Sequence, residues 1–412
     1  MGDETRLVPR IRFPEFTDDW EQRKLGDVVS LRGRIGFRGY KETDLVSKGQ
    51  GAITFSPSDI DEMGKVSNEN NKYLSWEKYD ESPEIQVKVG DILFTKTASI
   101  GKIGYVRELK EKATINPQFA LLTPNETTNG YFTFLSVRND DFMKQVRGIT
   151  GGSSVPTMSQ EKLKELIFMS PSIEEQERIG SFFDSIDNLI TLHQRKCDAY
   201  RKMKNGVAQK LFNQTVRFKK SDGTNYSDWA EYSLNDVLTE YNEKCGKNGT
   251  FEHVSLTQEG VIPKSDRYNR DFLVTHDDKQ YRVTHLNDIC YNPANLKFGV
   301  ICRNKYGDGI FSPIYVTYKV NEKFDCVFVE NYVTRSIFIN KALRYQQGTV
   351  YERMSVSSSD LLSMPFIAPI DKEEQTKIAN CLSEYDALIS ASEQKLEAYK
   401  KLKKAMLQKM FV

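Results

Sequence analysis

The feature that most constrains the fold of this 412-residue chain is an internal repeat. Residues 174–212 align without a gap with residues 373–411, at an offset of 199, and 15 of the 39 aligned positions are identical. A spacing this long is not that of a solenoid repeat. It indicates the duplication of a unit that consists of a domain followed by the repeated segment. The identities include Glu174-Glu175-Gln176/Glu373-Glu374-Gln375, Asp187/Asp386, Tyr200/Tyr399 and Gln209-Lys210/Gln408-Lys409.

Both repeated segments have the pattern of a long helix. No proline follows Pro171 or Pro369 within either segment, and apolar or small residues recur at alternating steps of three and four. This is the a/d pattern of a coiled coil. We therefore expect helices over residues 171–212 and 369–412, each about 40 residues and ~60 Å long. A stripe of that length needs a partner: the other copy, paired antiparallel, or alternatively the globular domain of the same repeat.

The charge pattern supports the antiparallel pairing. Lys and Arg number 58 and Asp and Glu number 57, so the net charge is only +1. Residues 172–187 hold five acids against Arg178, whereas residues 195–220 hold nine Lys or Arg against one acid. Residues 371–386 and 395–412 repeat this gradient. Each helix is acidic at its start and basic at its end, partly as the helix dipole favours. The near-neutral total therefore does not exclude a nucleic-acid partner.

The segments before the two helices share short landmarks. Asp19-Trp20 and Asp228-Trp229 each open the pattern D-W-x4-L-x-D-V, and Gly90-Asp91-Ile92 parallels Asn287-Asp288-Ile289. Between the landmarks the two halves diverge. We expect a first variable domain over 1–170, a helix over 171–212, a polar linker over 213–228, a second variable domain over 229–368 and a helix over 369–412.

The variable domains are predicted to mix helices and strands, which makes the fold class α+β. Runs rich in β-branched and aromatic residues predict strands, with Gly, Pro and Asn between them; the predicted strands are 92–95, 119–122, 315–320, 327–329 and 336–339. Short helices are predicted over 131–146 and 160–166.

Several classes of protein are not expected. There is no run of ~18 apolar residues for a membrane span, and the charged N-terminus has no apolar segment of a secretory signal. Six scattered cysteines without a C-x-x-C pair indicate free thiols in a cytoplasmic protein. No H-E-x-x-H, P-loop or Ser-His-Asp pattern is present, and Asn116-Pro117-Gln118-Phe119 departs at its third position from the N-P-P-[FY] of adenine methyltransferases. We expect neither a catalytic nor a metal site.

Basic, glycine-rich and polar loops recur at matched positions of the two halves. Lys, Arg, hydroxyl groups and bare backbone are the groups that hold phosphates, and Arg, Asn and Gln read base edges. Taken singly, each loop could be a solvated turn, but the recurrence favours contact with a polyanion. The candidate DNA-binding residues are Arg34, Arg38, Tyr40, Lys96, Thr97, Ser99, Lys102, Arg147, Gly151, Ser153 and Ser154 in the first half, and Asn292, Asn295, Lys297, Gln347, Tyr351 and Arg353 in the second.

Taken together, these features resemble the specificity subunit of type I restriction-modification systems. The resemblance covers essentially the whole chain. It rests on two divergent domains that each precede a near-identical helix opening with Glu-Glu-Gln and carrying Asp-x-Leu-Ile. The entry motif Arg12-Phe13-Pro14 with Asp19-Trp20, and the stretch from Gly90-Asp91-Ile92 to Ser99-Ile100-Gly101-Lys102, are similar to that family as well. The second domain departs from the loop pattern, with Asn292-Pro293-Ala294-Asn295-Leu296-Lys297 in its place.

The resemblance implies two target recognition domains, an antiparallel pair of spacer helices and a pseudo-two-fold axis. Each domain would read one half of a split site in double-stranded DNA, and the chain itself would bind no cofactor. Two modification subunits would bring S-adenosylmethionine, and two restriction subunits could add ATP- and Mg-dependent cleavage, in the cytoplasm of a bacterial or archaeal cell. The implied spacer and subunit-interface residues are Gln176, Ile179, Phe183, Ile186, Ile190, Tyr200, Gln375, Ile378, Leu382, Tyr385, Ile389 and Tyr399.

Two alternatives remain open at this point. The chain could be a DNA enzyme with its own methyltransferase or nuclease site, against which the missing motifs speak. It could also be a coiled-coil scaffold without a nucleic-acid partner, for which the charge pattern of the loops and helices is the discriminating feature.

Overall fold

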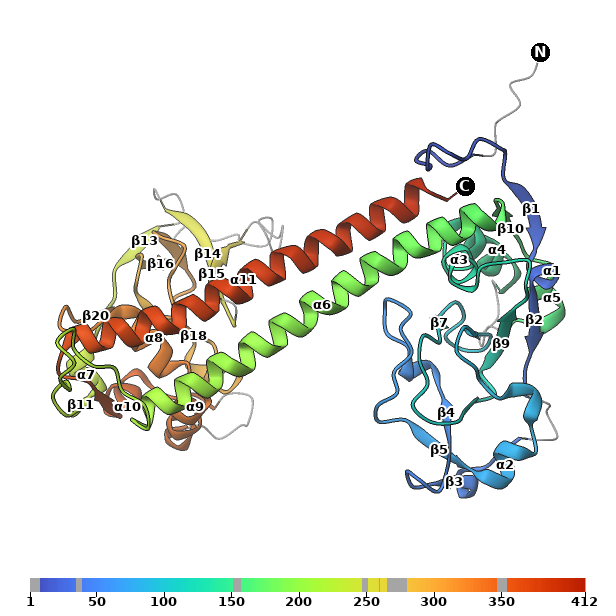
Figure 1. The fold of residues 1–412 in the computed structure, drawn as a ribbon. Coiled ribbons are helices and arrows are strands. Elements are labelled where there is room, and N and C mark those ends of the chain that lie inside the picture. Colours follow the sequence, from blue (N-terminus) through green and yellow to red (C-terminus); the bar gives the residue numbers. More distant parts are fainter. Residues whose placement is uncertain are drawn as a thin grey trace, which may run out of the picture. The chain divides into compact units, whose positions relative to one another are not determined.

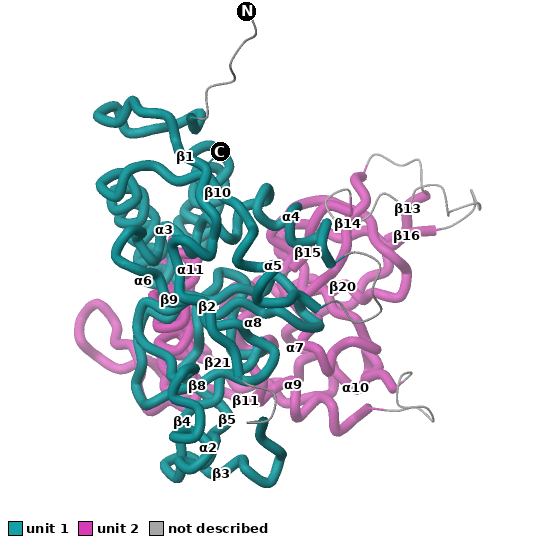
Figure 2. Tube along the Cα trace, turned by 90° about the vertical axis from the view of Figure 1, so that its right-hand side faces the viewer, with its two compact units in different colours: residues 1–194, 393–412 teal, residues 195–392 magenta. Residues whose placement is uncertain are grey.

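The chain divides into two compact units. The computed structural model describes residues 8–34, 39–150, 157–246, 251–258, 260–264, 280–346 and 354–411. One unit consists of residues 1–194 together with 393–412, and the other of residues 195–392 (Figure 2). This division differs from the expected linear order of domain, helix, domain and helix. Each long helix is shared between the two units, because the last part of the chain returns to the first unit.

The first unit contains two four-stranded sheets. The strand order of the first is β2 (Val29–Arg32), β9 (Phe119–Pro124), β6 (Ile92–Thr95) and β7 (Ile103–Tyr105), with all neighbours antiparallel. The second has the order β3 (Leu45–Val46), β5 (Lys72–Ser75), β4 (Gly51–Phe55) and β8 (Ala113–Ile115), with β4 and β8 parallel. β1 (Glu21–Lys24) precedes the strands of both sheets in the sequence and β10 (Ile167–Ser170) follows them, and these two strands pair antiparallel with each other. The helices of the variable domain are α1 (Leu25–Val28), α2 (Trp76–Asp80), α3 (Gly130–Ser136), α4 (Asp140–Thr150) and α5 (Gln160–Lys164).

The second unit repeats the first of these sheets and changes the second. β12 (Leu238–Tyr241), β20 (Val316–Val320), β17 (Ile289–Tyr291) and β18 (Ile301–Arg303) have the same antiparallel order as their counterparts. β11 (Ala230–Ser233) pairs with β21 (Pro365–Ala368). The other sheet has five strands, in the order β13 (Lys244–Gly246), β16 (Gln280–Thr284), β19 (Gly309–Phe311), β14 (Glu252–Thr257) and β15 (Gly260–Pro263). The helices are α7 (Leu234–Val237), α8 (Cys326–Val333), α9 (Ser336–Ala342) and α10 (Ser358–Leu362).

Two of the predicted strands are wrong. Residues 327–329 and 336–339 lie in α8 and α9. The side chain of Asp325 accepts hydrogen bonds from the amides of Val327 and Phe328 and so caps α8. The apolar face of this helix, with Phe328, is buried in the core of the second unit. Capping and burial outweigh the strand propensity of a Val- and Phe-rich run, which is a weak preference.

The two predicted long helices are confirmed as α6 (Ile173–Phe212, 40 residues) and α11 (Lys372–Lys409, 38 residues) (Figure 1). In the first unit, Lys403 lies beside Asp187 and the Tyr399 ring stacks on His193 at 5.5 Å. The residue numbers increase along one helix as they decrease along the other, so the pairing is antiparallel. In the second unit, Lys204 lies beside Asp386 in the same sense. No helix in the described part of the chain is both long and apolar enough to span a membrane.

The end of each long helix packs into a variable domain. In the first unit the ring of Phe411 stacks on Phe132 of α3, with centroids 5.5 Å apart. In the second unit the equivalent Phe212 contacts Phe328 of α8 at 5.3 Å. The backbone amide of Ile11 donates to the carbonyl of Lys409 at 2.9 Å, which fixes the end of α11 to the N-terminal segment of the first unit.

The Glu-Glu-Gln motif joins the start of each long helix to its own domain. The buried carboxylate of Glu175 receives two hydrogen bonds from the Arg12 guanidinium at 2.7 and 2.8 Å, and Glu374 is held by Arg217 at 2.8 and 3.0 Å. Gln176 accepts from the amide of Asn129, and Gln375 from the amide of Asp325, both at 2.9 Å. The two donors, Asn129 and Asp325, are the N-cap residues of α3 and α8. Each copy of the motif therefore makes the same contacts within its own unit, which explains why the motif is repeated.

The segment over 213–228, predicted as a polar linker, is a folded turn rather than a loose connection. Lys219 and Asn225 form an isolated bridge, and Tyr226 is buried. Arg217 ties the segment to α11 through Glu374. The counterpart of this contact in the first repeat is the one between Arg12 and Glu175.

Candidate nucleic-acid interface

A tight loop over residues 96–102 joins β6 to β7 in the first unit. The amide of Thr95 donates to the carbonyl of Lys102 at 3.0 Å. The amide of Lys102 donates to the carbonyl of Ser99 at 3.2 Å, and these two bonds close the turn. Gly101 has a φ of 86°, a left-handed conformation that favours glycine. Ser99 is exposed, whereas Thr97 and Lys102 are half-buried.

Two other segments border this loop. The amide of Met158 donates to the carbonyl of Lys96 at 2.8 Å, and Thr97 forms a bridge with Thr157. The chain therefore returns beside the loop immediately after residues 151–156. On the other side, the amide of Lys96 donates to the carbonyl of Gln118 at 2.8 Å. The structure thus brings together segments that the sequence places 20 to 60 residues apart.

Three polar residues beside the loop were missed by the sequence analysis: Asn116, Gln118 and Gln160. The Asn116 amide donates to the Gln118 side chain at 3.0 Å within the Asn-Pro-Gln turn that was compared with a methyltransferase motif. Gln160 and Lys96 both lie against Gly33, because a Cβ on this glycine would be 2.5 Å from Gln160 Nε2 and 3.3 Å from Lys96 Nζ. The signal that could have found them is the X-Pro turn, which recurs as Ser312-Pro313 in the second half.

Arg34 and Tyr40 contact one another in the first unit, and their contact with DNA stays a prediction. The Arg34 guanidinium is buried, donates to the carbonyl of Ile115 at 3.1 Å and lies over the Tyr40 ring at 5.0 Å. Burial lowers the pKa of this arginine, and burial also lowers the pKa of Lys96. Arg34 therefore holds the end of β8, so that little of its side chain is left for a ligand.

The equivalent connection in the second unit is a short 3-10 helix over Pro293–Phe298, between β17 and β18. Asn292 is buried and caps this helix by accepting from the amide of Ala294 at 3.1 Å. Asn295 is exposed, and the ammonium of Lys297 lies over the exposed Phe298 ring at 5.0 Å. The amide of Val356 donates to the carbonyl of Pro293 at 3.2 Å, in the same way as Met158 donates to Lys96 in the first unit.

Arg147 is exposed in the last turn of α4, where the helix dipole favours a cation. Seven other candidates lie outside the described residues, so the structure does not place them: Arg38, Gly151, Ser153, Ser154, Gln347, Tyr351 and Arg353.

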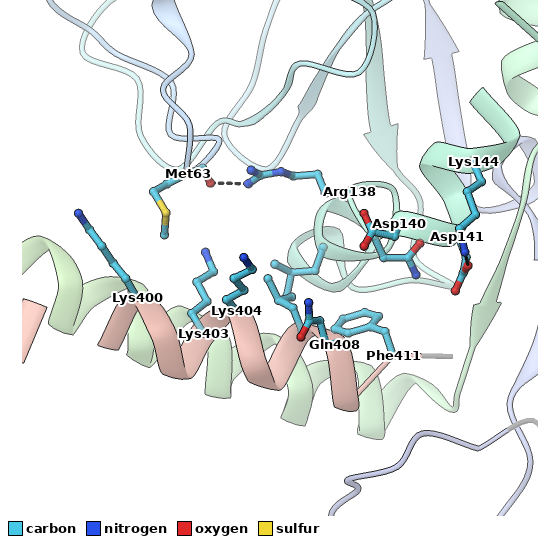
Figure 3. A pocket seen from close by; sticks show the side chains of 13 residues that line it. Met63, Arg138, Asp140, Asp141, Lys144, Lys400, Lys403, Lys404, Gln408 and Phe411 are labelled. Atoms are coloured by element: carbon cyan, nitrogen blue, oxygen red, sulfur yellow. Dashed lines mark hydrogen bonds and ion pairs between the residues drawn. The ribbon is translucent and has the colours of Figure 1, made fainter. Parts of the chain in front are cut away.

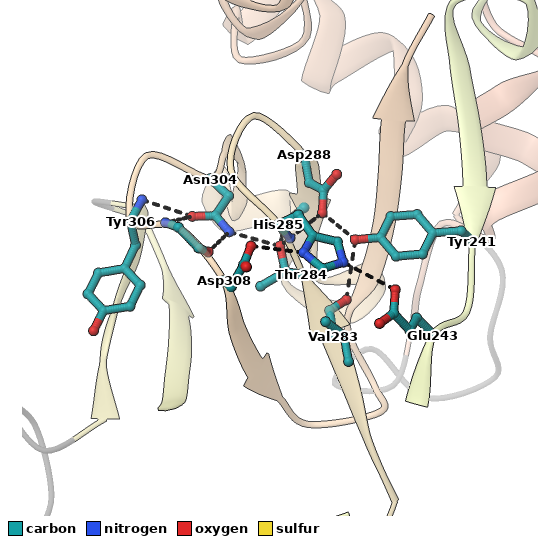
Figure 4. A network of polar contacts seen from close by, with 11 residues as sticks. Tyr241, Glu243, Val283, Thr284, His285, Asp288, Asn304, Tyr306 and Asp308 are labelled. Carbon is teal, nitrogen blue, oxygen red and sulfur yellow. Dashed lines mark hydrogen bonds and ion pairs between the residues drawn. The ribbon is translucent and has the colours of Figure 1, made fainter. Parts of the chain in front are cut away.

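A buried aspartate supports the strand before each loop. Asp91 accepts from the amide of Lys88 and from the Thr123 hydroxyl, both at 2.7 Å, and follows Gly90, which has a φ of 93°. Asp288 accepts from the amide of His285 at 2.5 Å and from the Tyr241 hydroxyl, and follows Asn287, which has a φ of 73° (Figure 4). Burial raises the pKa of both carboxyl groups. The repeated Gly/Asn-Asp landmark is therefore a turn that positions β6 and β17.

His285 bridges two carboxylates in the second unit. Its Nδ1 lies 2.9 Å from Asp308 and its Nε2 lies 3.1 Å from Glu243, while its ring stacks on Tyr241 (Figure 4). The two carboxylates sit on opposite ring nitrogens, which does not suit a shared metal ion. Among the residues that the structure describes, no group of three or more His, Cys, Asp or Glu side chains could hold a metal.

The comparisons with known proteins agree with one another. The family model for the type I restriction modification DNA specificity domain matches residues 17–199, which is the first repeat. A protein of Methanocaldococcus jannaschii described as the MjaX specificity subunit of a type I restriction enzyme is 26% identical over 95% of this chain and 93% of its own length. The MjaVIII specificity subunit of the same organism is 23% identical over 52% of this chain and 51% of its own length.

This chain is similar to the type I specificity subunits. Solved structures share its fold. The crystal structure of the S subunit of a type I restriction-modification system from M. genitalium matches with a TM-score of 0.63 and 13% identity, over 98% of this chain and 99% of that one. A chain from a structural study of assembly and conformational transition in a type I system matches with a TM-score of 0.50 and 16% identity, over 95% of this chain and 97% of that one.

In this chain, most of the predicted interface residues on the helices face inward. Their side chains pack against the paired helix or the variable domain, so they form the spacer rather than an open surface; a direct contact with another subunit stays a prediction. The buried ones are Gln176, Ile179, Phe183, Ile186, Ile190, Gln375, Ile378 and Leu382. The half-buried ones are Tyr200, Tyr385, Ile389 and Tyr399.

Proposed function

We propose that this chain is the non-catalytic DNA-reading subunit of a type I restriction-modification complex, and that each variable domain reads one half of a split double-stranded target. The observation that carries the proposal is the matched pair of connections, 96–102 and 292–300. Both lie between equivalent strands, and each accepts a hydrogen bond from the amide of a later residue, Met158 in the first unit and Val356 in the second. Their backbone positions are equivalent whereas their residues differ, which is what two readers of different half-sites require.

The exposed groups of these loops suit a nucleic acid. Ser99 and Lys102 in the first unit can hold phosphates, and Arg147 adds a charge at the end of α4. In the second unit Asn295 can donate to and accept from a base edge, while Lys297 and the exposed Phe298 lie beside it. The amides of Asn116 and Gln118 extend the polar surface around Lys96.

The paired helices are proposed to set the distance between the half-sites. Helices of 38 and 40 residues are ~60 Å long, and side chains packed along them make a stiff spacer. Two readers on such a spacer could engage half-sites about one turn of DNA apart, ~10 bp from centre to centre.

We further infer that two modification subunits dock on the outward faces of the helices. Repeat-equivalent positions carry exposed apolar side chains, Met203 with Leu402 and Leu388 with the partly buried Leu189. A duplicated surface provides two docking sites for identical partners. S-adenosylmethionine would then be bound by the modification subunits, and ATP and Mg by two optional restriction subunits. Such a complex would act in the cytoplasm, where cellular DNA is accessible.

Selection from random DNA pools tests the proposal. The purified chain, alone and with modification subunits, is incubated with the pools at several salt concentrations, and bound DNA is sequenced. We expect a split motif and affinity that falls as salt rises. A chimera in which residues 20–165 come from another specificity subunit should change only one half of the motif. Enrichment of no motif, or a change in both halves, would contradict the proposal.

A further inference from the structure

A cavity of about 480 Å³ opens in the first unit between the end of α11 and the turn that joins α3 to α4 (Figure 3). None of the residues that line it belongs to the candidate DNA-binding set. Cavities that hold small molecules in proteins have volumes of ~300–1,000 Å³. The size therefore suits a small organic ligand.

The wall of the cavity is mainly cationic, with five basic and two acidic side chains. Three of the basic groups already have partners: Lys403 with Asp187 at 2.6 Å, Lys144 with Asp141 at 2.7 Å, and Arg138 with the backbone carbonyls of residues 62 and 63. Lys400 and Lys404 are exposed and lie one helical turn apart on α11. Within the described part of the chain neither of these two ammonium groups is paired with a carboxylate. They remain available to an anion.

Another part of the wall is apolar. Met63, Leu407 and Phe411 line it, and the Phe411 ring is held in place by stacking on Phe132. Figure 3 shows Lys403 and Lys404 rising from α11 toward Arg138, with Phe411 at one end of the same cavity. A ligand with a flat apolar part and an anionic part would find complementary groups in the same cavity.

The second repeat offers an internal comparison with this cavity. There, the side chain of Arg335 occupies the equivalent space. Arg335 and Asn139 are equivalent, since each stands at the N-cap of the following helix, three residues before a buried phenylalanine. The Arg335 guanidinium lies over the ring of Phe212, the counterpart of Phe411, at 4.1 Å. In the first unit Asn139 instead caps α4 by accepting from the amide of Phe142 at 2.8 Å. The shorter side chain leaves the space open.

We propose that this cavity binds a small phosphate-bearing molecule of the nucleotide class. Its phosphates would be held by Lys400 and Lys404, because the lysine ammonium is a compact charge that binds phosphate well. Its base would lie against Met63, Leu407 and Phe411. A bound nucleotide would join α11 to the α3–α4 turn and so stabilise the folded first unit.

Titration calorimetry of the full-length chain with ATP, AMP and inorganic pyrophosphate, at constant ionic strength and without DNA, tests the proposal. We expect saturable binding of ATP, weaker binding of pyrophosphate because it has no base, and a rise in melting temperature with ATP. The double variant Lys400→Gln/Lys404→Gln should bind ATP about 10-fold more weakly. The matched control is Lys395→Gln/Lys401→Gln, which removes the same charge from exposed positions of α11 that do not line the cavity.

The variant Asn139→Arg gives a second test, because it copies the arginine of the other repeat. It should fill the cavity and abolish ATP binding, while its own melting curve shows whether the chain still folds. The absence of saturable ATP binding in the wild type would overturn the proposal. So would equal weakening in both lysine pairs, or pyrophosphate binding as tight as that of ATP. The measurements use no DNA, so their outcome is independent of the proposed reading function.

Discussion

The ammonium nitrogen of Lys403 lies 2.6 Å from a carboxylate oxygen of Asp187, and only 5% of the lysine side chain is exposed. The repeat places the same pair, Lys204 with Asp386, in the second unit at the same distance. There the carboxylate is 46% exposed. The surroundings differ because Asp187 also accepts hydrogen bonds from the Arg107 guanidinium and the Tyr131 hydroxyl, both in the first variable domain. One duplicated ion pair is therefore buried in one unit and partly exposed in the other.

Removing the two lysines should have unequal effects on stability. Lys403→Ala leaves a buried carboxylate with one charge partner fewer, and we expect a loss of ~3 kcal/mol in the free energy of unfolding. Lys204→Ala breaks a pair near the surface, and we expect a loss below ~1 kcal/mol. Urea denaturation of both variants, followed by hydrogen exchange to locate the weakened unit, measures the difference. Equal losses would show that burial does not distinguish the pairs.

Replacement of Gln176 should destabilise the first unit. In Gln176→Leu the amide of Asn129 loses its acceptor at 2.9 Å and the carbonyl of Pro171 its donor at 3.0 Å, in a buried place. Each unsatisfied buried group costs ~1–3 kcal/mol, so a loss of ~2–4 kcal/mol is expected. The exposed neighbour Glu177 provides the control variant Glu177→Leu, which should change stability little. Thermal unfolding of the two variants checks the expectation.

The long helices and three strands of the first sheets, β6, β9 and β20, could be predicted because their signals are local or repeated. Heptad spacing predicted α6 and α11, and the duplicated D-W-x4-L-x-D-V landmark marked the start of both domains. The strands predicted over 327–329 and 336–339 failed for a non-local reason. The burial of Phe328 and Phe338 in the core of the second unit favours a helix at these residues. A single sequence does not show which residues form that core.

The candidate contact residues could be predicted only in part. Ser99, Lys102, Asn295 and Arg147 do lie at least partly exposed, as glycine-rich or polar loops suggest. The sequence could not show that the buried Arg34 guanidinium donates to the carbonyl of Ile115, and its contact with DNA stays a prediction. The neighbourhood of Lys96 with Gln118 and Met158 depends on pairing between distant segments, which leaves no pattern along the chain.

The second unit should lose a little stability as the pH rises above the pKa of His285. Burial lowers this pKa, but the hydrogen bonds with Asp308 and Glu243 outweigh burial, and the pKa is raised above 6.5. Since the folded state binds the proton more tightly, the stabilisation is complete below pH ~6.5 and is lost as the pH rises through the folded pKa. The imidazole is about one-third exposed, so we expect no more than ~1 kcal/mol. His285→Gln should remove the pH dependence of the melting temperature in this range, and an unchanged profile would show that the bridge contributes nothing.

Two loop substitutions should separate phosphate contacts from base contacts. Lys102→Gln is expected to weaken binding to all DNA sequences alike and to lower the slope of affinity against salt by about one unit. Asn295→Ala is expected to relax the preference at one position of one half-site by ~1–3 kcal/mol and to leave the salt slope unchanged. Binding measured at four salt concentrations, with the selected motif and with single-base variants of it, distinguishes the two effects. A loss of base preference in Lys102→Gln would reverse the assignment.

Lengthening the paired helices should widen the gap in the DNA target. Seven residues inserted into each helix, after Gln194 in α6 and after Ser392 in α11, preserve the a/d stripe and leave the Lys403–Asp187 and Lys204–Asp386 pairs intact. The insertion adds ~10 Å to the spacer, which corresponds to about 3 bp of additional gap. The control is the same insertion in α6 alone, which misaligns the two helices and should abolish selective binding. If the double insertion selects a motif with the original gap, the helices do not set the distance, and the spacing must come from the bound partner subunits.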